Sequence, residues 1–386
     1  MNPFPILPLD RRQDSKLCYK LDRTQFLEEG RQDIELLYQP IIDLKKKKVA
    51  RVEALVRFLD DGEMTSPDKV LPFLSSEEII QVNFAVLKRA SQDIRRWQRQ
   101  GLSVQVSVNI EIFQLEDPNF AQRVLRILKN ENVSPRSLSF EILEGNDQEI
   151  SSQMLRQINE LRQEQITFAL DDIGSAYSGL ARIRDLPIDA LKLDKDFVSA
   201  IHENPQHLKF IQALSALSHS LDKKFIVEGV EDFTVLNALR RLGVSLIQGY
   251  VFSKPIPADQ IPLYLCDLSI PPHSNTLRSN DWLGAYAEIL RERERLIAMT
   301  HHAPEMLNPK IIHQISNTVM ESCLLMAPHI YNLYYQLRSL ISHAAAFQES
   351  IKNDDLIEKI EQGYRELLMA IENKMCEEIY DKHRTQ

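Results

Sequence analysis

The sequence predicts an α/β fold: a TIM-like (β/α)8 barrel with an antiparallel first hairpin, followed by a small all-α helical domain. Between Leu36 and Phe252, short runs of apolar and β-branched residues alternate with longer amphipathic segments, as in parallel strands joined by crossover helices. There are eight such runs, which indicates a closed barrel. After Cys266 the alternation ends, and the rest of the chain has the apolar periodicity of helices.

The predicted strands are separated by segments long enough for helices, except at the start. We expect strands at Leu36–Ile42, Val49–Arg57, Val104–Ile110, Ser137–Leu143, Thr167–Ile173, Ala190–Leu193, Phe225–Val230 and Ile247–Phe252. Only residues 43–48 separate the first two strands, too few for a crossover helix, so these strands should form an antiparallel hairpin. Ser66 before Pro67 and Asp117 before Pro118 are typical of helix starts.

The C-terminal part spaces apolar residues three and four positions apart, which predicts a small helical bundle. Its last segment forms a narrow seam suited to another helix, made of Ile357, Ile360, Tyr364, Leu367 and Ile371. We expect homodimerisation through this seam. The expected divisions are a tail at 1–21, a barrel at 22–267, a linker at 268–279, and a regulatory or dimerising bundle at 280–386.

Composition limits the partners and the location of the protein. A length of 386 residues suits two domains, and a net charge of -9 argues against binding to nucleic acid or to anionic lipid. The four cysteines are far apart, which indicates reduced thiols rather than disulfides or a zinc site. No run approaches the roughly 20 apolar residues of a membrane helix, and no signal peptide is evident. We therefore expect a cytoplasmic protein without a membrane span.

Acidic and amide side chains recur at or near the ends of the predicted strands. They are Glu53, Asn109, Glu141, Glu144, Asp171, Asp172, Glu228 and Gln248, and Lys192 lies in the sixth strand. In a barrel of this kind, the carboxyl ends of the strands converge at one mouth. Carboxylate and amide oxygens suit hard cations such as Mg²⁺ or Mn²⁺, so the mouth is a candidate metal site.

Charge balance favours two metal ions at this mouth. Five carboxylates, those of Glu53, Glu141, Asp171, Asp172 and Glu228, cannot all stay ionised in a confined site without compensation. Two divalent cations together with Lys192 would balance them, and two-metal sites suit in-line hydrolysis of phosphoesters. Each residue alone has a simpler explanation: a structural ion pair, a helix N-cap at Asp171-Asp172, or a lysine extended along the barrel wall. The combination is what favours the metal site.

The same positions resemble the EAL domain family, in an ordered series of motifs that runs from about Asp22 to Leu265. The motifs are Tyr38–Ile41, Val52–Arg57 with the triplet Glu53-Ala54-Leu55, Val106–Asn109, Phe140–Glu144, Leu170–Gly174, Leu186-Pro187, Leu191–Asp194, Glu228–Glu231, Gln248–Tyr250 and Lys254-Pro255. The resemblance implies hydrolysis of cyclic di-GMP to linear pGpG, with two Mg²⁺ or Mn²⁺ ions as cofactors.

The resemblance also implies a role for each of these residues. One metal would be held by Glu53, Asn109, Glu141 and Asp171, and the second by Asp171, Asp172 and Glu228. The catalytic residues would be Glu228, which helps deprotonate the attacking water, Lys192, which orients that water or stabilises phosphate charge, and Glu53. Gln39 and Arg57 would contact the substrate, while Glu144 and Gln248 would hold the metal ligands in place.

This chain departs from the family pattern mainly in the loop after Asp172. The family typically has Phe-Gly-Thr-Gly-Tyr-Ser-Ser there, whereas this chain has Ile173-Gly174-Ser175-Ala176-Tyr177-Ser178-Gly179. Alanine at 176 would be strained if the backbone needs a positive φ. The altered loop motivates a second hypothesis, a catalytically weak or inactive cyclic di-GMP receptor that signals through the helical domain. A third, a nucleotide-independent interaction module, is disfavoured because the acidic residues are retained.

Overall fold

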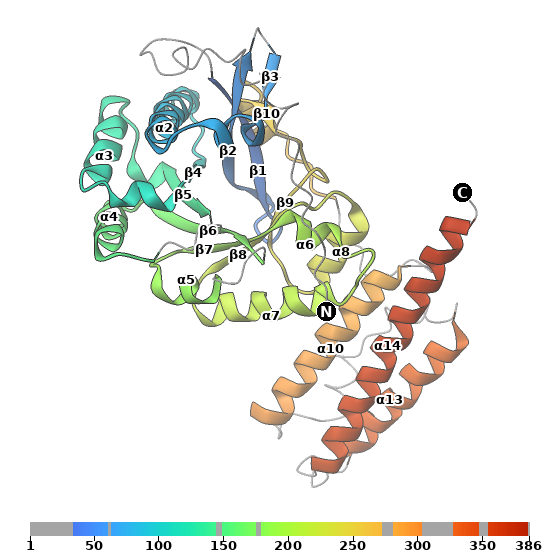
Figure 1. Cartoon of the computed structure of the whole chain (residues 1–386). Helices are drawn as coiled ribbons and strands as arrows, with labels where there is room; N and C mark the ends of the chain where they lie inside the picture. Colours follow the sequence, from blue (N-terminus) through green and yellow to red (C-terminus); the bar gives the residue numbers. More distant parts are fainter. Residues whose placement is uncertain are drawn as a thin grey trace, which may run out of the picture.

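The computed structural model describes residues 34–60, 63–143, 149–174, 179–271, 281–302, 327–346 and 354–384. At its centre, eight strands close into a barrel surrounded by helices (Figure 1). The barrel strands are β1 (Ile34–Asp43), β2 (Lys48–Asp60), β4 (Gln105–Ile110), β5 (Leu138–Leu143), β6 (Thr167–Ile173), β7 (Ala190–Leu193), β8 (Lys224–Val227) and β9 (Leu246–Gln248). The predicted (β/α)8 fold is therefore confirmed.

The first hairpin also agrees with the prediction. Strand β1 runs antiparallel to both β2 and β9, whereas the other neighbouring barrel strands pair in parallel. Two short strands were not expected: β3 (Glu63–Thr65) pairs with β2, and β10 (Ile256–Pro257) pairs with β1. Both are too short to give a periodic apolar pattern, so the sequence offers little signal for them.

Helices cover the outside of the barrel. They are α2 (Ser76–Arg99), α3 (Phe120–Asn130), α4 (Ser152–Gln163), α5 (Gly179–Asp185), α6 (Lys195–Ser199), α7 (His207–Ser220), α8 (Phe233–Arg241) and α9 (Ile261–Cys266). Two expected helix starts lie elsewhere. The Ser66-Pro67 step opens only a 3-10 turn, Pro67–Lys69, whereas α2 starts at a capping box formed by Ser75 and Glu78. The N-cap of α3 is Asn119 rather than Asp117.

The largest aromatic side chains anchor α2 to the hairpin. The Tyr38 ring packs edge-on against Trp97, with 4.9 Å between ring centroids. The Tyr38 hydroxyl donates to a carboxylate oxygen of Asp93 at 2.8 Å, and the Trp97 indole N–H donates to the carbonyl of Ala258 at 2.9 Å. These buried polar tips all have partners, so α2 is fixed against β1 and the segment after β10.

The C-terminal helices α10 (Trp282–His302), α13 (Pro328–Ala346) and α14 (Asp354–Arg384) form a bundle beside α7 and α8 (Figure 1). A buried ion pair joins the bundle to the barrel: a guanidinium nitrogen of Arg241, in α8, lies 3.3 Å from a carboxylate oxygen of Glu288, in α10. On a neighbouring surface, Lys209 pairs with Glu372 at 3.1 Å.

The seam predicted for a dimer is filled by helices of the same chain. Ile360, Tyr364, Leu367 and Ile371 are buried in the bundle core, and the Tyr364 hydroxyl donates to Glu292 of α10 at 3.0 Å. A homodimer would therefore need a different surface. The expected tail at 1–21 and most of the expected linker, residues 272–279, lie outside the described residues. None of the helices in the described ranges combines the length and apolar content needed to cross a bilayer.

Candidate functional site

The interior of the barrel is built in two successive layers of side chains. The deeper layer is made of Ile41, Arg51, Ser107, Ser139, Ala169, Ala190, Ile226 and Leu246. Because successive side chains of a strand alternate between its faces, residues two positions nearer the mouth point inward as well. Those residues are Gln39, Glu53, Asn109, Glu141, Asp171, Lys192, Glu228 and Gln248. Strand alternation and barrel closure thus bring together eight of the side chains singled out in the sequence.

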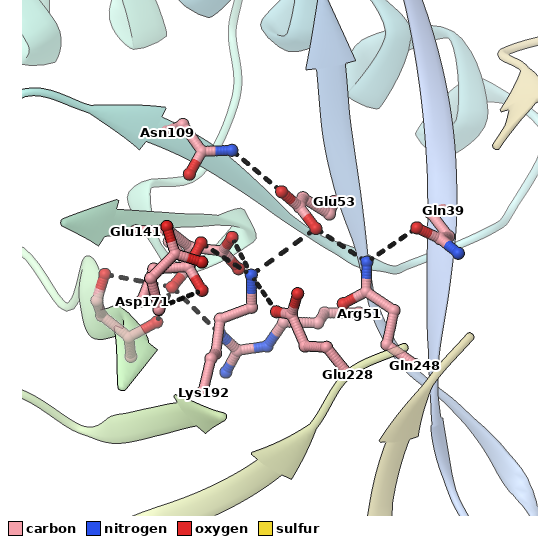
Figure 2. Close-up of polar contacts among 12 residues, drawn as sticks. Gln39, Arg51, Glu53, Asn109, Glu141, Asp171, Lys192, Glu228 and Gln248 are labelled. Atoms are coloured by element: carbon pink, nitrogen blue, oxygen red, sulfur yellow. Dashed lines mark hydrogen bonds and ion pairs between the residues drawn. The ribbon is translucent and has the colours of Figure 1, made fainter. Parts of the chain in front are cut away.

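Lys192 lies at the centre of this second layer and is fully buried (Figure 2). Its ammonium nitrogen lies 2.5 Å from a carboxylate oxygen of Glu228 and 2.6 Å from one of Glu141. It lies 3.0 Å from Asp171 and 3.5 Å from Glu53. One cation therefore faces four carboxylates from four different strands or strand ends.

Two amide side chains orient Glu53. The amide nitrogen of Asn109 donates to one carboxylate oxygen at 2.9 Å, and that of Gln248 donates to the other at 2.7 Å (Figure 2). The Gln248 nitrogen also lies 3.1 Å from the side-chain oxygen of Gln39, whose own amide donates to the carbonyl of Ser253. Glu53 is therefore held by two amides, one on each oxygen, and by Lys192, and these three groups come from three different strands.

Burial and charge crowding shift the pKa values of these groups. Burial raises the pKa of Glu141 to about 8 and that of Asp171 to about 6, and the neighbouring carboxylates add to this against the pull of Lys192. Burial likewise raises the pKa of Glu228 well above its usual range. One lysine is too little positive charge for four buried carboxylates, so the site favours additional cations.

The pKa values of Glu53 and Lys192 move in the direction of ionisation. Burial opposes the charge on Glu53, but Lys192 and the two amides outweigh it and lower the pKa of Glu53. For Lys192, burial is outweighed by the surrounding carboxylates, which raise its pKa well above the usual range. The Lys192 ammonium is thus a permanent charge at neutral pH.

The donor set suits a hard cation. Glu53, Glu141 and Asp171 each offer a carboxylate oxygen, and the three oxygens lie within 4.8 Å of one another. In addition, Asn109 Oδ1, Glu141 Oε1 and Gln248 Oε1 are buried with no hydrogen-bond partner. Buried oxygens without a partner are costly unless something binds them, and all of these are ligand types that Mg²⁺ and Mn²⁺ prefer. The residues present therefore fit a divalent metal site.

The remaining predicted site residues lie differently. Asp172 has a positive φ of 58°, and the pairing register between β6 and β7 shifts around it. Such a bulge re-aims a side chain that strict alternation would point outward. Arg57 lies further out along β2, and its guanidinium donates to the carbonyl of Val56 at 2.8 Å. Glu144 and residues 175–178 of the altered loop fall outside the described residues.

Arg51 is an interior residue that sequence reasoning missed. It is buried in the deeper layer, and its guanidinium donates to the hydroxyl of Ser139 at 3.1 Å. Burial lowers its pKa from the usual value, against the pull of Glu141 and Asp189. The available signal was its position two residues before Glu53, on the same face of the strand. With Arg51 counted, two divalent cations would leave the barrel interior with a net positive charge, which suits an anionic ligand.

Gly249 fixes the distance between the ends of β8 and β9. A Cβ atom at this position would lie 2.0 Å from the carbonyl oxygen of Val230 and 2.5 Å from its nitrogen. We expect Gly249→Ala to lower the free energy of unfolding by about 3 kcal/mol, because backbone must move to accommodate the methyl group. Denaturant unfolding monitored by circular dichroism measures this change.

Gly243→Ala is the matched control for that substitution. Gly243 has a positive φ of 85° but nothing within 4 Å of an added Cβ, so only backbone strain of about 1 kcal/mol is expected. Equal losses in the two variants would contradict a steric role for Gly249.

Comparisons with known proteins agree with this geometry. A family model described as the EAL domain matches residues 23–255. Cyclic di-GMP phosphodiesterase NbdA from Pseudomonas aeruginosa is 32% identical over 235 residues, which cover 60% of this chain and 30% of that protein. The solved EAL domain of DcpA from Mycobacterium smegmatis is 26% identical, with a TM-score of 0.53, and the match covers 63% of this chain and 100% of that one.

A second solved structure, PaMucR phosphodiesterase in complex with c-di-GMP, is also 26% identical. Its TM-score is 0.56, and the match covers 64% of this chain and 98% of that one. The chain spans about a third of the length of the curated relatives it matches, at 32%, 30% and 29% of three of them.

Proposed function

Because the chain belongs to the EAL domain family, we propose that it hydrolyses cyclic di-GMP to linear pGpG in the cytoplasm, using two Mg²⁺ or Mn²⁺ ions. The observation that supports this most directly is the convergence of Glu53, Glu141, Asp171 and Glu228 on Lys192. Relatives named cyclic di-GMP phosphodiesterases and a structural neighbour solved with c-di-GMP add the substrate class.

In the proposed site, two sets of side chains at the mouth would each bind one of two cations. Glu53, Asn109, Glu141 and Asp171 would hold the first, and Asp171, Asp172 and Glu228 the second. When bound, two divalent cations stabilise charge on the attacking and leaving oxygens of an in-line displacement. Gln248 keeps Glu53 oriented through the 2.7 Å hydrogen bond, and Glu144 is proposed to support the ligands in the same way.

The reaction replaces one P–O bond with another. A water oxygen bonds to phosphorus, one ribose oxygen leaves, and the proton lost by the water is balanced by the proton gained by the leaving oxygen. Glu228 is proposed to accept the proton, because its carboxylate lies in the mouth with one oxygen 2.5 Å from the Lys192 ammonium nitrogen. Lys192 stays protonated, so it acts by its charge on the water or the phosphate and not as a base.

Substrate binding is assigned to residues at the rim of the mouth. Gln39 offers an amide beside Gln248, and Arg57 offers a planar guanidinium that can donate two parallel hydrogen bonds to a phosphate. In the structure the Arg57 guanidinium donates to the carbonyl of Val56, so it must rotate to reach a ligand at the mouth.

The purified chain is expected to convert cyclic di-GMP to pGpG when Mg²⁺ or Mn²⁺ is present, as measured by chromatography of the nucleotides. Glu53→Gln preserves shape but removes a charged metal ligand, so turnover should fall roughly 100-fold or more. Glu164→Gln changes an exposed glutamate after α4, at the other end of the barrel, and should leave turnover unchanged.

Tight nucleotide binding without turnover in either metal would overturn the enzymatic proposal. It would instead favour the receptor hypothesis that the altered loop at 173–179 motivated. Isothermal titration with cyclic di-GMP in Ca²⁺, followed by exchange into Mg²⁺, separates binding from hydrolysis on the same sample.

A further inference from the structure

Positive charge gathers at the end of the barrel opposite the acidic mouth. The turn between β1 and β2 and the first residue of β2 carry four consecutive lysines, Lys45 to Lys48, and β8 begins at Lys224 directly after Lys223. Since β1 is antiparallel to its neighbours, this turn lies at the amino ends of the parallel strands. In a chain with a net charge of -9, such a local concentration of lysines requires an explanation beyond solubility.

A cavity of about 590 Å³ opens at this end of the barrel. Its walls come from the β1–β2 turn, the last turns of α7, the start of β8, the loop between α8 and β9, and α10 of the helical bundle. The side chains that could contact a ligand are those of Lys45, Ser215, His219, Lys223, Lys224 and Ser245. This volume is typical of cavities that bind small molecules.

Two of the three lysines in this wall have ammonium groups available to a ligand. Among the residues that the structure describes, no side-chain hydrogen bond or ion pair joins Lys45 or Lys224 to a partner. Lys223 donates to the carbonyl of Ile188 at 2.8 Å, which fixes its ammonium group at the edge of the cavity. Partial burial of the Lys224 ammonium group, followed by the nearby charges of Arg51 and Lys46, lowers the pKa of Lys224 against the pull of Asp189 and Asp43.

Few acidic groups face the cavity, although the charges of Asp189 and Asp43 outside its wall act on Lys224. Among the described residues that line the cavity, only Glu294 is acidic. Its carboxylate accepts a hydrogen bond from the Gln212 amide at 2.7 Å. Asp43 lies behind the turn, where its carboxylate accepts from the backbone N–H groups of Lys45 and Lys46.

We propose that this cavity is a second ligand site, separate from the acidic mouth, that binds a small molecule carrying one or more phosphate groups. Lysine ammonium groups and serine hydroxyls are the donors that a phosphate requires, and the concave wall favours a small anion over an extended surface. Because Glu294 belongs to α10, a bound anion would also lie next to the contact between Gln212 and the helical bundle. This site does not depend on the proposed phosphodiesterase activity.

Isothermal titration of the full chain with inorganic pyrophosphate tests the site, in buffer stripped of divalent ions. Without metal the acidic mouth repels anions, so binding reports on the basic cavity. We expect saturable binding with a 1:1 ratio that weakens as salt is added. The double variant Lys45→Gln/Lys224→Gln should weaken binding roughly tenfold or more. Glu53→Gln, altered at the mouth, should bind pyrophosphate normally.

The matched control is Lys47→Gln/Lys48→Gln, which removes the same amount of charge from the β1–β2 hairpin, at side chains that do not line the cavity. All four lysines are exposed, so both double variants should fold, and circular dichroism checks this. Equal weakening of pyrophosphate binding in the two double variants would mean that binding depends only on the overall positive charge at this end of the barrel, and it would overturn the proposal. Absence of pyrophosphate binding would also overturn it, and so would binding confined to vesicles of anionic phospholipid.

Discussion

Replacing Lys192 with methionine is expected to reduce the proposed phosphodiesterase turnover strongly and to destabilise the metal-free protein at neutral pH. The ammonium group is fully buried and lies within 3.5 Å of four carboxylates. Methionine keeps most of the side-chain volume but leaves those carboxylates without their central cation. Removing one member of a buried ion pair typically costs about 3 to 5 kcal/mol. Turnover should fall roughly 1,000-fold, because charge stabilisation in the site is lost.

Divalent metal should rescue the stability of this variant but not its activity. Bound cations supply the missing positive charge, so the rise in melting temperature on adding Mn²⁺ should be larger for Lys192→Met than for the unmodified chain. Calorimetry with and without metal measures the difference, and Lys129→Met, at an exposed position of α3, is the control. A variant that is stable without metal and fully active would show that the amine is dispensable.

The metal-free protein should lose stability as the pH rises from about 5 to about 8. In the folded state the pKa of Glu141 is raised from 4.5 to about 8 and that of Asp171 from 3.8 to about 6. At pH values between the ordinary pKa and the raised pKa of each group, the folded protein retains a proton that the unfolded chain has released. The free energy of unfolding therefore falls as the pH rises. The lowered pKa of Glu53 acts only below 4.5 and does not offset this. We expect the melting temperature to drop by about 5 °C or more.

Saturating Mg²⁺ or Mn²⁺ should reduce or reverse this pH dependence. Metal ligands must be deprotonated, so metal affinity rises as the acids ionise. Melting temperatures across the same pH range, with and without metal, give the comparison. Glu141→Gln removes the group with the higher of the two quoted pKa values and should flatten the metal-free profile. A metal-free profile that is already flat would mean that the carboxylates are less buried in solution than in the structure.

The fold, and which residues lie at the mouth, could be predicted because both follow from patterns among residues that are close together in the sequence. Alternation of apolar runs with amphipathic segments identified the eight barrel strands, and the position of Glu53, Asn109 and Glu141 at or near strand ends placed them at one mouth. Closure of the sheet then brings together strands that are far apart in the sequence. The functional roles of these residues remain proposals.

The parts that sequence reasoning missed depend on long-range contacts. Arg51 is chemically suited to solvent, and only the closed barrel around it shows that it is buried against Ser139. The seam from Ile360 to Ile371 has the spacing expected for any helical partner, and periodicity cannot say whether that partner is another chain or α10 and α13 of the same one. Short strands such as β10 exist only because β1 offers them an edge.

The burial of α10 also bears on the order in which the protein can be made. The first half of α10, including Trp282, Tyr286 and Ile289, has almost no solvent exposure because it lies between α8 and α14. In a nascent chain that has just completed the barrel, the apolar surface of α8 that α10 covers would stay exposed to solvent until α10 emerges from the ribosome. The interval between the two events is when chaperones would be most needed.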